Sequence, residues 1–365
     1  MNVLFAGGGT GGHVFPAIAV AQWLRQKHPA IRLLFVGSTR GVEARIIPAH
    51  GFEFEPMSAG ALKGVSLAVK MTTLRRLPAS LASAREILKR FGAEVVVGIG
   101  GYASGPAVMA AAMCGCPRMI LEQNSIPGLT NRLLAYFSTY AAVNFEESAR
   151  FFPGNAVVTG NPVRESFFNL PAPLNKEPFT VLVFGGSQGA SAVNGMMRDA
   201  LEELCSAGQP FRFIHQSGEK DFERVKAAYI NHSCDADVRP FFDDMPEQFR
   251  RAHLIVARSG ASALAEIAAA GRPSILIPLP TATDNHQRRN AEVFRDRGAG
   301  VLMDQKKTTG AELARTILKL RENSAWRSRM AEAARSLARP DAAEKIGGLI
   351  EALAGVRRTQ SSVIN

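Results

Sequence analysis

The sequence has few cysteines, and their number and spacing exclude several kinds of fold and site. The four cysteines among the 365 residues are Cys114, Cys116, Cys205 and Cys234. Four thiols are too few for a disulfide framework in a chain of this length. Cys114 and Cys116 are separated by a single residue, which fits neither a redox C-x-x-C motif nor a zinc knuckle. We therefore expect reduced, buried thiols.

Aspartate is absent from the first half of the chain. The first aspartate is Asp199, and the eight acidic residues up to position 163 are all glutamates. An aspartate-dependent mechanism is therefore excluded from the N-terminal part. Basic residues outnumber acidic ones by 43 to 32, which gives a formal net charge of +11.

Long hydrophobic runs are absent as well. No stretch reaches the ~18 consecutive apolar residues that a membrane-spanning helix needs. The first basic residue, Arg25, comes too late for the charged start of a signal peptide. We expect a soluble protein, or one that lies on a membrane surface. With 46% apolar and 21% charged residues the chain can fill buried cores, and its length favours two domains.

The chain repeats one pattern of strand, glycine turn and helix. Residues 3–12 read VLFA-GGGTGG, an apolar strand and a glycine turn, and a helix is expected over 14–26. Residues 181–190 repeat this as VLVF-GGSQGA, before a helix that runs to Leu204. Continuous apolar strands that alternate with helices are typical of parallel sheets covered on both faces. The sequence therefore predicts an α/β fold of two Rossmann-like, doubly wound parallel-sheet domains.

The remaining strands and the domain limits follow from the same alternation. We expect further strands at 33–36, 95–99, 118–121, 157–159, 211–215, 238–242, 254–257 and 274–277. The join at Asn161-Pro162-Val163 divides the chain into domains at 1–163 and 164–341, and residues 356–365 are expected to be a loose polar tail. Ligands of such sheets bind beyond the carboxyl ends of the strands, so we expect both glycine turns on one cleft between facing domains.

A third glycine turn, GIGGYASGP at residues 98–106, follows the strand that begins at 95. Pro106 suits the first position of the helix that follows. Turns of this kind direct backbone N–H groups and the positive end of a helix dipole at an anion. Three of them at strand-to-helix junctions indicate a ligand with several phosphate groups.

The first turn also fits a different function. Gly7, Gly9 and Gly12 match the dinucleotide fingerprint G-x-G-x-x-G, which needs an acid at the end of the second strand. Residues 36–40 read VGSTR and contain no acid. Arg40 could instead bind a 2′-phosphate, so an NADP-dependent oxidoreductase remains an alternative.

The second half carries a pattern suited to a nucleotide sugar. After the strand at 254–257 and the sequence RSG comes an alanine-rich helix at 261–271, in which Glu266 is the only charge. A carboxylate can accept hydrogen bonds from both hydroxyls of a ribose, although a solvated helix charge is the alternative. The segment TDNHQRRN at 283–290 mixes donors and acceptors beyond the next strand, where they could contact sugar hydroxyls or cap a helix.

His13 is the candidate base. It closes the first glycine turn and lies in the first turn of the expected helix, where the dipole disfavours imidazolium and keeps the ring able to accept a proton. A histidine that merely caps the loop is the alternative. Asp235-Ala236-Asp237 spells D-x-D, which holds a metal in some sugar transferases. It lies in a polar segment before the strand expected at 238–242, so we expect no metal there. Asp243 and Asp244 are expected to be a loop or capping pair.

Residues 60–91 form a basic, amphipathic stretch. The charges are Lys63, Lys70, Arg75, Arg76, Arg85, Lys89 and Arg90 against the single acid Glu86. Two apolar rows flank Pro78, namely Leu67, Met71 and Leu74, then Leu81, Ala84, Leu88 and Phe91. We expect two surface helices packed on the sheet, or a face that lies on an anionic membrane. Each basic residue near such a surface would contribute ~1 kcal/mol to the free energy of binding. Nucleic acid fits poorly, because Phe91 is the only aromatic residue in the stretch.

Taken together, the motifs resemble the MurG family, the bacterial cell-wall N-acetylglucosaminyltransferases of glycosyltransferase family 28. The resemblance runs in order over about residues 1–355. It rests on GGTGGHVFPA from Gly8, GGYASGP from Gly100, EQN from Glu122 with PGLTN from Pro127, GNPVR from Gly160, GGSQGA from Gly185, and RSGA from Arg258 with Glu266.

The resemblance implies a GT-B fold and a reaction in peptidoglycan synthesis. N-acetylglucosamine would pass from UDP-GlcNAc to the C4 hydroxyl of MurNAc in undecaprenyl-diphospho-MurNAc-pentapeptide (lipid I), with inversion, to give lipid II. It implies a peripheral protein on the cytoplasmic face of the inner membrane that needs no cofactor. It further implies that the last helix, at about 342–354, packs back on the N-terminal domain.

The resemblance also implies roles for individual residues. UDP-GlcNAc would be contacted from the N-terminal side of the cleft by Thr10, Gly11, Gly12 and Asn124, and the acceptor diphosphate would lie on the turns that hold Gly9, Gly101, Tyr102 and Ser104. The donor would be held by Arg164, Ser187, the Phe242 backbone, Ala261, Ser262, Ala263, Leu264, Ala265, Glu266 and Gln287. Within this set Ser187 would meet the diphosphate, Phe242 the uracil edge, Glu266 the ribose and Gln287 the sugar hydroxyls.

We therefore expect a direct displacement in which His13 deprotonates the acceptor hydroxyl. Backbone N–H groups at 186–189, the adjoining helix end and Arg164 would stabilise the departing UDP without a metal. The chain departs from its relatives at Leu121, where they often have histidine, so no role of that histidine can apply. A non-catalytic UDP-sugar- or lipid-binding protein of the same fold remains an alternative.

Overall fold

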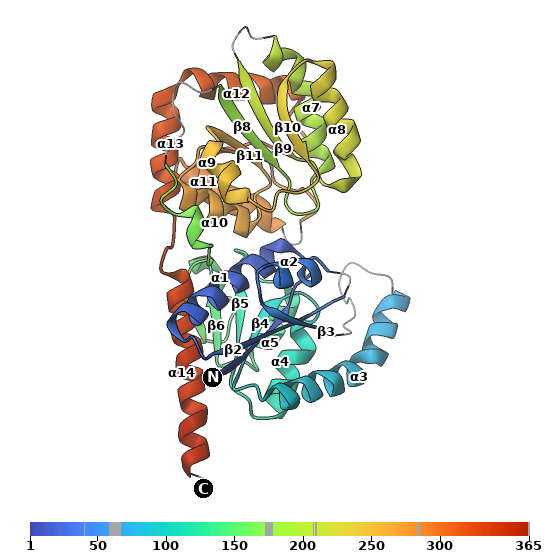
Figure 1. The fold of residues 1–365 in the computed structure, drawn as a ribbon, viewed down its shortest axis with the longest axis vertical. Helices are drawn as coiled ribbons and strands as arrows, with labels where there is room; N and C mark the ends of the chain where they lie inside the picture. Colours follow the sequence, from blue (N-terminus) through green and yellow to red (C-terminus); the bar gives the residue numbers. More distant parts are fainter. Residues whose placement is uncertain are drawn as a thin grey trace. The chain divides into compact units, whose positions relative to one another are not determined.

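The computed structural model describes residues 1–39, 41–57, 67–171, 178–206, 208, 210–282 and 285–363, with the backbone alone at 67–76 and 356–363. Contacts within the chain divide it into two units (Figure 1). The first unit is Met1–Arg164 with Arg339–Asn365, and the second is Glu165–Ala338.

The first unit is built on a seven-stranded sheet of order β3-β2-β1-β4-β5-β6-β7 in which every neighbouring pair is parallel. Its strands are β1 (Asn2–Gly7), β2 (Arg32–Gly37), β3 (Glu53–Pro56), β4 (Val95–Gly100), β5 (Arg118–Glu122), β6 (Tyr140–Val143) and β7 (Ala156–Val158). Its helices are α1 (Gly11–Lys27), α2 (Glu43–Ala49), α3 (Leu67–Phe91), α4 (Ser104–Met113), α5 (Leu129–Ala135), α6 (Glu146–Ala149) and α14 (Ala342–Val363).

Helices cover both faces of this sheet, because its central strands are apolar on both sides. Val3 and Phe5 of β1 are packed in one core with α1, α2 and α14. Leu4 and Ala6, which alternate with them, are packed in the other core with α3, α4 and α5. The last helix of the chain thus belongs to the first unit, where Gly347 allows α14 to approach the ring of Trp23 on α1.

The second unit repeats this plan with a six-stranded parallel sheet of order β10-β9-β8-β11-β12-β13. Its strands are β8 (Phe179–Phe184), β9 (Phe211–Gln216), β10 (Asp235–Arg239), β11 (Leu254–Ala257), β12 (Ser274–Leu276) and β13 (Val301–Leu302). Its helices are α7 (Ser191–Cys205), α8 (Phe222–Asn231), α9 (Met245–Arg251), α10 (Ala261–Ala270), α11 (His286–Asp296), α12 (Gly310–Glu322) and α13 (Ser324–Ser336), with short 3-10 turns at Glu165–Phe167 and Glu219–Asp221. The prediction of two parallel-sheet α/β domains is confirmed.

Three expectations about individual elements are wrong. The strand expected at 238–242 is β10, Asp235–Arg239, and it therefore contains the D-x-D sequence. An edge strand tolerates this polar sequence because part of it faces water. The tail expected from residue 356 is helical through Val363, since no glycine or proline interrupts α14 after Gly355. The two helices expected within 60–91 are the single helix α3, with Pro78 in its interior.

Helix α3 also clarifies the amphipathic stretch. Ala84, Leu88 and Phe91 are buried against the sheet, so most of the second apolar row is core. Pro78 is exposed, and a proline in a helix costs one backbone hydrogen bond without ending the helix here. Lys63 lies outside the described residues, and so do the side chains of Lys70, Arg75, Arg76 and the first apolar row. No described helix is both long enough and apolar enough to cross a membrane.

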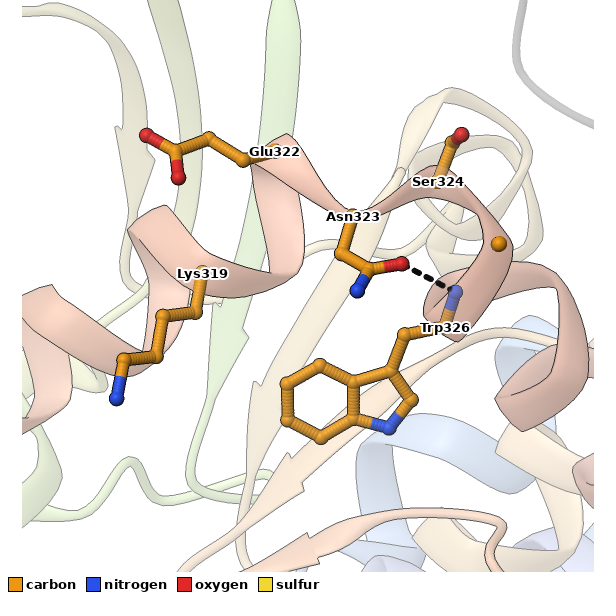
Figure 2. A pocket seen from close by; sticks show the side chains of 6 residues that line it. Lys319, Glu322, Asn323, Ser324 and Trp326 are labelled. Atoms are coloured by element: carbon orange, nitrogen blue, oxygen red, sulfur yellow. Dashed lines mark hydrogen bonds between the residues drawn. The ribbon is translucent and has the colours of Figure 1, made fainter.

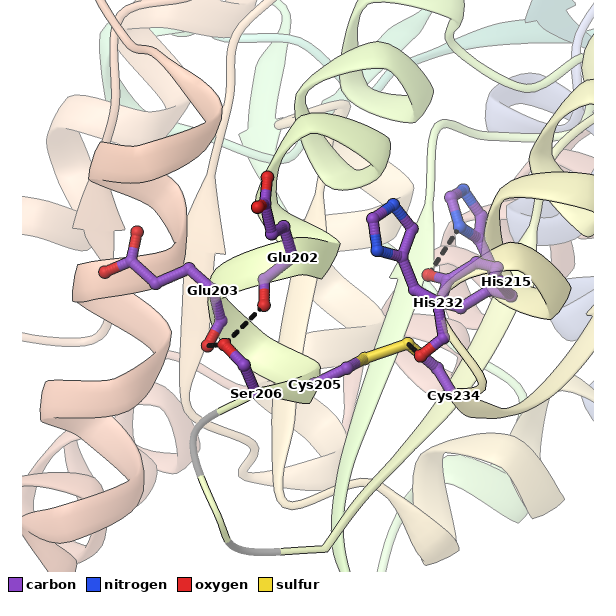
Figure 3. The surroundings of a disulfide bond; sticks show 8 residues. Glu202, Glu203, Cys205, Ser206, His215, His232 and Cys234 are labelled. Atoms are coloured by element: carbon purple, nitrogen blue, oxygen red, sulfur yellow. Dashed lines mark hydrogen bonds between the residues drawn. A yellow bond between two sulfur atoms is a disulfide. The ribbon is translucent and has the colours of Figure 1, made fainter.

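The expectation of reduced, buried cysteines is wrong for three of the four. Cys205, the last residue of α7, forms a disulfide with Cys234, just before β10 (Figure 3). Their Cα atoms are 6.0 Å apart, within the usual range for a disulfide. Helix α7 ends on the side of the sheet where the parallel strands begin. Cys205 and Cys234, which are distant in the sequence, therefore meet there. Neither Cys114, which is exposed, nor Cys116, which is buried, forms a disulfide.

Candidate functional site

In the first unit, the two glycine turns that follow β1 and β4 form one corner. The Gly8 N–H donates to the carbonyl oxygen of Gly100, with 3.1 Å between N and O. A Cβ atom at Gly101 would overlap the Gly8 carbonyl, and the φ angle of Gly101 is +78°, so this close approach requires glycine. Because β1 and β4 are neighbours in the sheet, the fold brings these two predicted turns together.

His13 lies in this corner as the third residue of α1 and is half-buried. Its Nδ1 is 3.0 Å from the carbonyl oxygen of Gly8. A carbonyl can only accept, so Nδ1 carries the hydrogen, and in the neutral ring Nε2 holds the lone pair. The ring lies against Gly100, where an added Cβ would be 2.8 Å from Cδ2 of His13. The geometry therefore makes Nε2 the atom of His13 that can accept a proton.

The other residues predicted in this corner differ in accessibility. Thr10 is exposed and precedes α1, which has no acidic residue in its first turn, and Gly11 is buried while Gly12 is half-buried. Tyr102 is exposed. Ser104 is completely buried, with its hydroxyl facing Gly98, and lies inside the unit.

Gly9 and Pro106 differ in the structure from what the sequence predicts for them. The N–H of Gly9 donates to the Glu43 carboxylate at 2.7 Å, so this N–H does not point at a ligand phosphate. Helix α4 begins at Ser104, which makes Pro106 its third residue instead of its first. Proline is tolerated there because the first N–H groups of a helix have no partner within it.

Asn124 is held by Glu122, the last residue of β5. The backbone N–H and the side-chain amide of Asn124 both donate to Oε1 of Glu122, at 2.9 and 3.1 Å. Oε2 accepts from Gly128 N–H at 3.2 Å and from the Asn131 amide at 2.9 Å. Burial raises the pKa of Glu122, and these four donors oppose that rise. The carboxylate therefore fixes the segment that carries Asn124.

Arg164, which was expected at the donor, belongs to the first unit. Its guanidinium lies over the ring of Phe15 on α1, 4.7 Å from the ring centroid. Phe15 is two residues from His13, so the structure associates Arg164 with the corner that holds the candidate base.

In the second unit the glycine turn after β8 is packed against the end of β9. A Cβ atom at Gly189 would overlap the Ser217 carbonyl, and its φ angle is +74°. Gly186 is exposed and Ser187 is half-buried, directly before α7, which has no acidic residue in its first turn. The exposed turn thus leads into the N-terminus of α7, and the role of Ser187 at a diphosphate stays a prediction.

Gln216, the last residue of β9, links this turn to Phe242. Its side-chain Nε2 donates to the Gly186 carbonyl, and its Oε1 accepts from the Phe242 N–H, both at 2.9 Å. The ring of Phe242 is buried, and the Arg239 guanidinium lies 4.9 Å from its centroid. Sequence reasoning missed Gln216, although a polar residue at the carboxyl end of a central strand was the signal for it.

On helix α10, part of the segment predicted to bind the donor is accessible. Ala261 and Leu264 are buried, whereas Ser262, Ala263, Ala265 and Glu266 are half-buried on one side. Glu266 is therefore at the surface of an alanine-rich helix and not within the core. Arg258, just before this helix, donates to the carbonyls of Ile277 and Pro278, and burial lowers its pKa to about 10.

Gln287 is the second residue of α11 and is half-buried. Its Oε1 accepts from the Leu279 N–H at 3.0 Å, and its carbonyl accepts from Ser259 Oγ at 2.8 Å. These bonds connect the start of α11 to the ends of β11 and β12. Thr283 and Asp284, from the same predicted segment, lie outside the described residues.

Three further features have no predicted role in binding the substrate. Asp235 and Asp237 of the D-x-D sequence pair with Arg212 and Arg239, and no group of residues suited to hold a metal occurs in the part of the chain that is described. Asp244 precedes α9 and accepts from Gln248. A hollow of about 500 Å³ lies where α12 meets α13 (Figure 2). It is lined by Lys319, Glu322, Asn323, Ser324, Ala325 and Trp326, none of which is a predicted site residue.

A buried polar network supports the start of α7. His215 bridges the Tyr229 hydroxyl and Asn194 Oδ1, each at 3.0 Å, and Asn194 donates to Asp221 and the Ser217 carbonyl. Burial lowers the pKa of His215 from 6.5 to about 3. The ring therefore stays neutral in the folded unit across that range.

This shift predicts an acid-sensitive second unit. Below pH 6.5 the unfolded chain binds a proton at His215 that the folded chain does not, so the free energy of unfolding falls as the pH drops towards 3. The slope from this group approaches ~1.4 kcal/mol per pH unit. Between pH 7 and 4, the free energy of unfolding measured with urea should fall less steeply in His215→Gln than in the wild-type protein. The exposed His232→Gln is the control, and equal slopes in all three proteins would contradict the assignment.

Comparison with known proteins identifies the family. The family model described as glycosyltransferase family 28 N-terminal domain matches residues 3–143, and the C-terminal domain model matches residues 180–346. The chain belongs to glycosyltransferase family 28. Membership argues against the NADP-dependent oxidoreductase. The geometry agrees, since the N–H of Gly9, the second glycine of the fingerprint, donates to the Glu43 carboxylate within the chain.

The relatives of this family 28 chain match it over nearly its full length. A protein of Geobacter metallireducens is 43% identical over 95% of this chain and 97% of its own, and one of Geobacter sulfurreducens is 43% identical with the same coverage. Both are named UDP-N-acetylglucosamine–N-acetylmuramyl-(pentapeptide) pyrophosphoryl-undecaprenol N-acetylglucosamine transferase. The crystal structure of Acinetobacter baumannii MurG is 30% identical, with a TM-score of 0.72 over 96% of this chain and 99% of that one.

Proposed function

We propose that this chain catalyses the reaction for which its relatives are named. It transfers N-acetylglucosamine from UDP-GlcNAc to the MurNAc of undecaprenyl-diphospho-MurNAc-pentapeptide, which converts lipid I to lipid II. The observation that carries this function is the 43% identity over 95% of the chain to transferases of that name. Both family 28 domains are present, one for each unit.

The second unit binds the donor in this proposal. The exposed turn at Gly186 and Ser187, with the N-terminus of α7, holds the diphosphate. The Glu266 carboxylate accepts hydrogen bonds from the ribose hydroxyls. Because Gln216 occupies the N–H of Phe242, the Phe242 carbonyl is the backbone group that accepts from N3–H of uracil. Gln287 contacts the hydroxyls of the transferred sugar.

The first unit binds the acceptor and supplies the base. Nε2 of His13 removes the proton from the C4 hydroxyl of MurNAc as that oxygen bonds to the anomeric carbon. The bond from the anomeric carbon to the UDP oxygen breaks, and the configuration inverts. UDP leaves as an anion that the N–H groups of Gly186, Ser187 and Gln188 stabilise, without the N–H of Gly189, which donates to the Gly186 carbonyl. The acceptor diphosphate lies on the turns at Thr10–Gly12 and Gly101–Tyr102, without the N–H of Gly9 or the side chain of Ser104.

A transfer assay tests this function. The full chain is incubated with UDP-GlcNAc labelled in the sugar and a short-chain lipid I analogue. The expected products are labelled lipid II analogue and one UDP for each sugar transferred. Donor binding without UDP release would instead identify a non-catalytic UDP-sugar-binding protein, and no donor binding at all would contradict the proposal.

The acceptor carries a lipid, and the first unit has a surface suited to a membrane. Leu129, Leu133, Tyr136 and Phe137 recur on and just after α5 and are exposed, Tyr136 by 71%. Met113 at the end of the adjacent α4 is exposed as well. Lys89 adds positive charge on α3, which packs on α4, whereas Arg90 pairs with Glu55 of β3. This surface lies on the anionic cytoplasmic face of the inner membrane, with apolar side chains in the interface and basic ones near the headgroups.

A single charge in that apolar row should weaken attachment. Leu133→Glu places a carboxylate where an apolar side chain enters the interface, and the fraction bound to vesicles with anionic lipid should fall about tenfold. Ile230→Glu on α8 is the matched control, since Ile230 is 66% exposed but lies in the second unit. Equal binding by both variants in a vesicle flotation assay would show that α5 does not contact the membrane.

A further inference from the structure

The peptide group between Gly8 and Gly9 is held by hydrogen bonds at both ends. Its carbonyl oxygen, on Gly8, accepts from Nδ1 of His13 at 3.0 Å. Its N–H, on Gly9, donates to Oε2 of Glu43 at 2.7 Å. One planar, polarisable group thus lies between a carboxylate and the ring that carries the candidate base.

The surroundings of Glu43 are shaped to keep its carboxylate in this place. Glu43 is the first residue of α2 and is 1% exposed, and its other oxygen accepts from the Ser38 N–H at 2.9 Å. A Cβ atom at Gly8 would be 2.5 Å from its carboxyl carbon, and one at Gly37 would be 2.8 Å from its Cγ. A side chain at either position would displace the carboxylate from its two N–H partners. A buried charge that loses its hydrogen bonds costs folding free energy.

The geometry points to Glu43 as a positioning residue that acts on His13 through the Gly8–Gly9 peptide. A negative charge on the N–H side of a peptide makes its carbonyl a stronger acceptor, because successive hydrogen bonds polarise one another. The Gly8 carbonyl then fixes the hydrogen of His13 on Nδ1, leaves the lone pair on Nε2, and stabilises the imidazolium that forms when Nε2 takes the acceptor proton. Carboxylate, peptide and imidazole form one chain.

Other titratable groups of the described residues lie near this corner. His50, directly after α2, donates to the Ile46 carbonyl, Tyr102 follows β4, and Arg164 lies over Phe15. Glu43 is the group that the structure shows hydrogen-bonded to the N–H of the Gly8–Gly9 peptide. The inference rests on the proposed role of His13 as base, so its test must separate the two.

The main test is Glu43→Gln in the full chain. The amide keeps the size of the side chain but removes the charge and turns one acceptor into a donor facing a backbone N–H. We expect kcat for the lipid I analogue to fall ~10-fold to 100-fold, and the acid-side midpoint of the kcat/KM profile to move down by about one pH unit. The Kd for UDP-GlcNAc should stay within about twofold of wild type. The exposed Glu53→Gln on β3 is the control, with no change expected.

A double-mutant cycle separates this inference from the function on which it rests. If Glu43 acts through His13, then Glu43→Gln should change turnover less than about twofold in a His13→Ala background. An equal loss in both backgrounds would show a general structural role and overturn the inference. A folded Glu43→Gln protein with wild-type turnover and pH profile would overturn it as well. Normal turnover of His13→Ala would instead overturn the role of His13 as base.

A measurement on the unaltered protein covers the case in which Glu43→Gln does not fold. With 15N-labelled histidine, long-range 1H–15N spectra report which ring nitrogen carries the hydrogen. The chain has seven histidines, and His13 is assigned by its loss in His13→Ala. At pH 8 we expect a neutral ring protonated on Nδ1. Protonation on Nε2 would overturn the inference, because the Gly8 carbonyl could then accept nothing from the ring.

Discussion

Replacing His13 with alanine is expected to lower kcat by ~10²–10⁴-fold, the range that a general base supplies. The reason is the fixed tautomer, since Nδ1 donates to Gly8 and only Nε2 can take the acceptor proton. The Kd for UDP-GlcNAc should stay within about twofold of wild type, because the proposed donor contacts lie in the second unit. Steady-state kinetics with a lipid I analogue and calorimetric donor titration measure the two quantities.

Two controls make the His13 result specific. His232→Ala removes an exposed histidine of the second unit and should leave kcat unchanged. Thermal unfolding of His13→Ala should remain near that of wild type, since the ring is half-buried. If kcat of His13→Ala falls less than threefold in a folded protein, another group removes the proton and the assignment of the base is wrong.

Replacing Glu266 with alanine is expected to weaken UDP-GlcNAc binding ~10-fold to 100-fold, since hydrogen bonds to a charged group contribute ~1.5–3 kcal/mol. Turnover at saturating donor should fall much less, because ribose is remote from the reacting bond. Glu266→Gln keeps one acceptor oxygen and should give an intermediate Kd. Calorimetric titration with UDP-GlcNAc and with UDP alone checks both variants.

The control for this result is Glu322→Ala, at the exposed end of α12. The carboxylate of Glu266 is half-buried on an otherwise uncharged helix, whereas that of Glu322 is far along the chain from every predicted donor residue. If Glu266→Ala binds the donor as wild type does but turns over slowly, then Glu266 acts in the chemistry, and the division of roles between the units fails.

Much of the fold could be predicted because the central strands are buried on both faces. β1, β4 and β8 read as apolar runs into glycine and β11 as an apolar run before Arg258, and each was expected within one or two residues. Short or polar strands give a weaker signal. β3 reads EFEP, β6 reads YAAV and β13 has two residues, and none of the three was expected. β10 reads DADVR and was expected too late in the chain.

The site was predictable where a residue follows a strand or glycine turn directly. His13 and Ser187 are of this kind, and the structure places them at the turns after β1 and β8. Glu43 could not be found in this way, because its partners are backbone N–H groups 34 and 5 positions earlier in the chain. Only its place as the first acidic residue of the sequence set it apart. The Cys205–Cys234 disulfide likewise depends on where α7 ends in space.

The claim that two family 28 domains divide the work between donor and acceptor is tested most directly by crystals soaked with UDP-GlcNAc. We expect uracil beside the Phe242 backbone, the ribose hydroxyls on Glu266 and the diphosphate on the turn at Gly186–Gln188. Donor density at the glycine turns after β1 and β4, or no density in the second unit at saturating concentration, would contradict it.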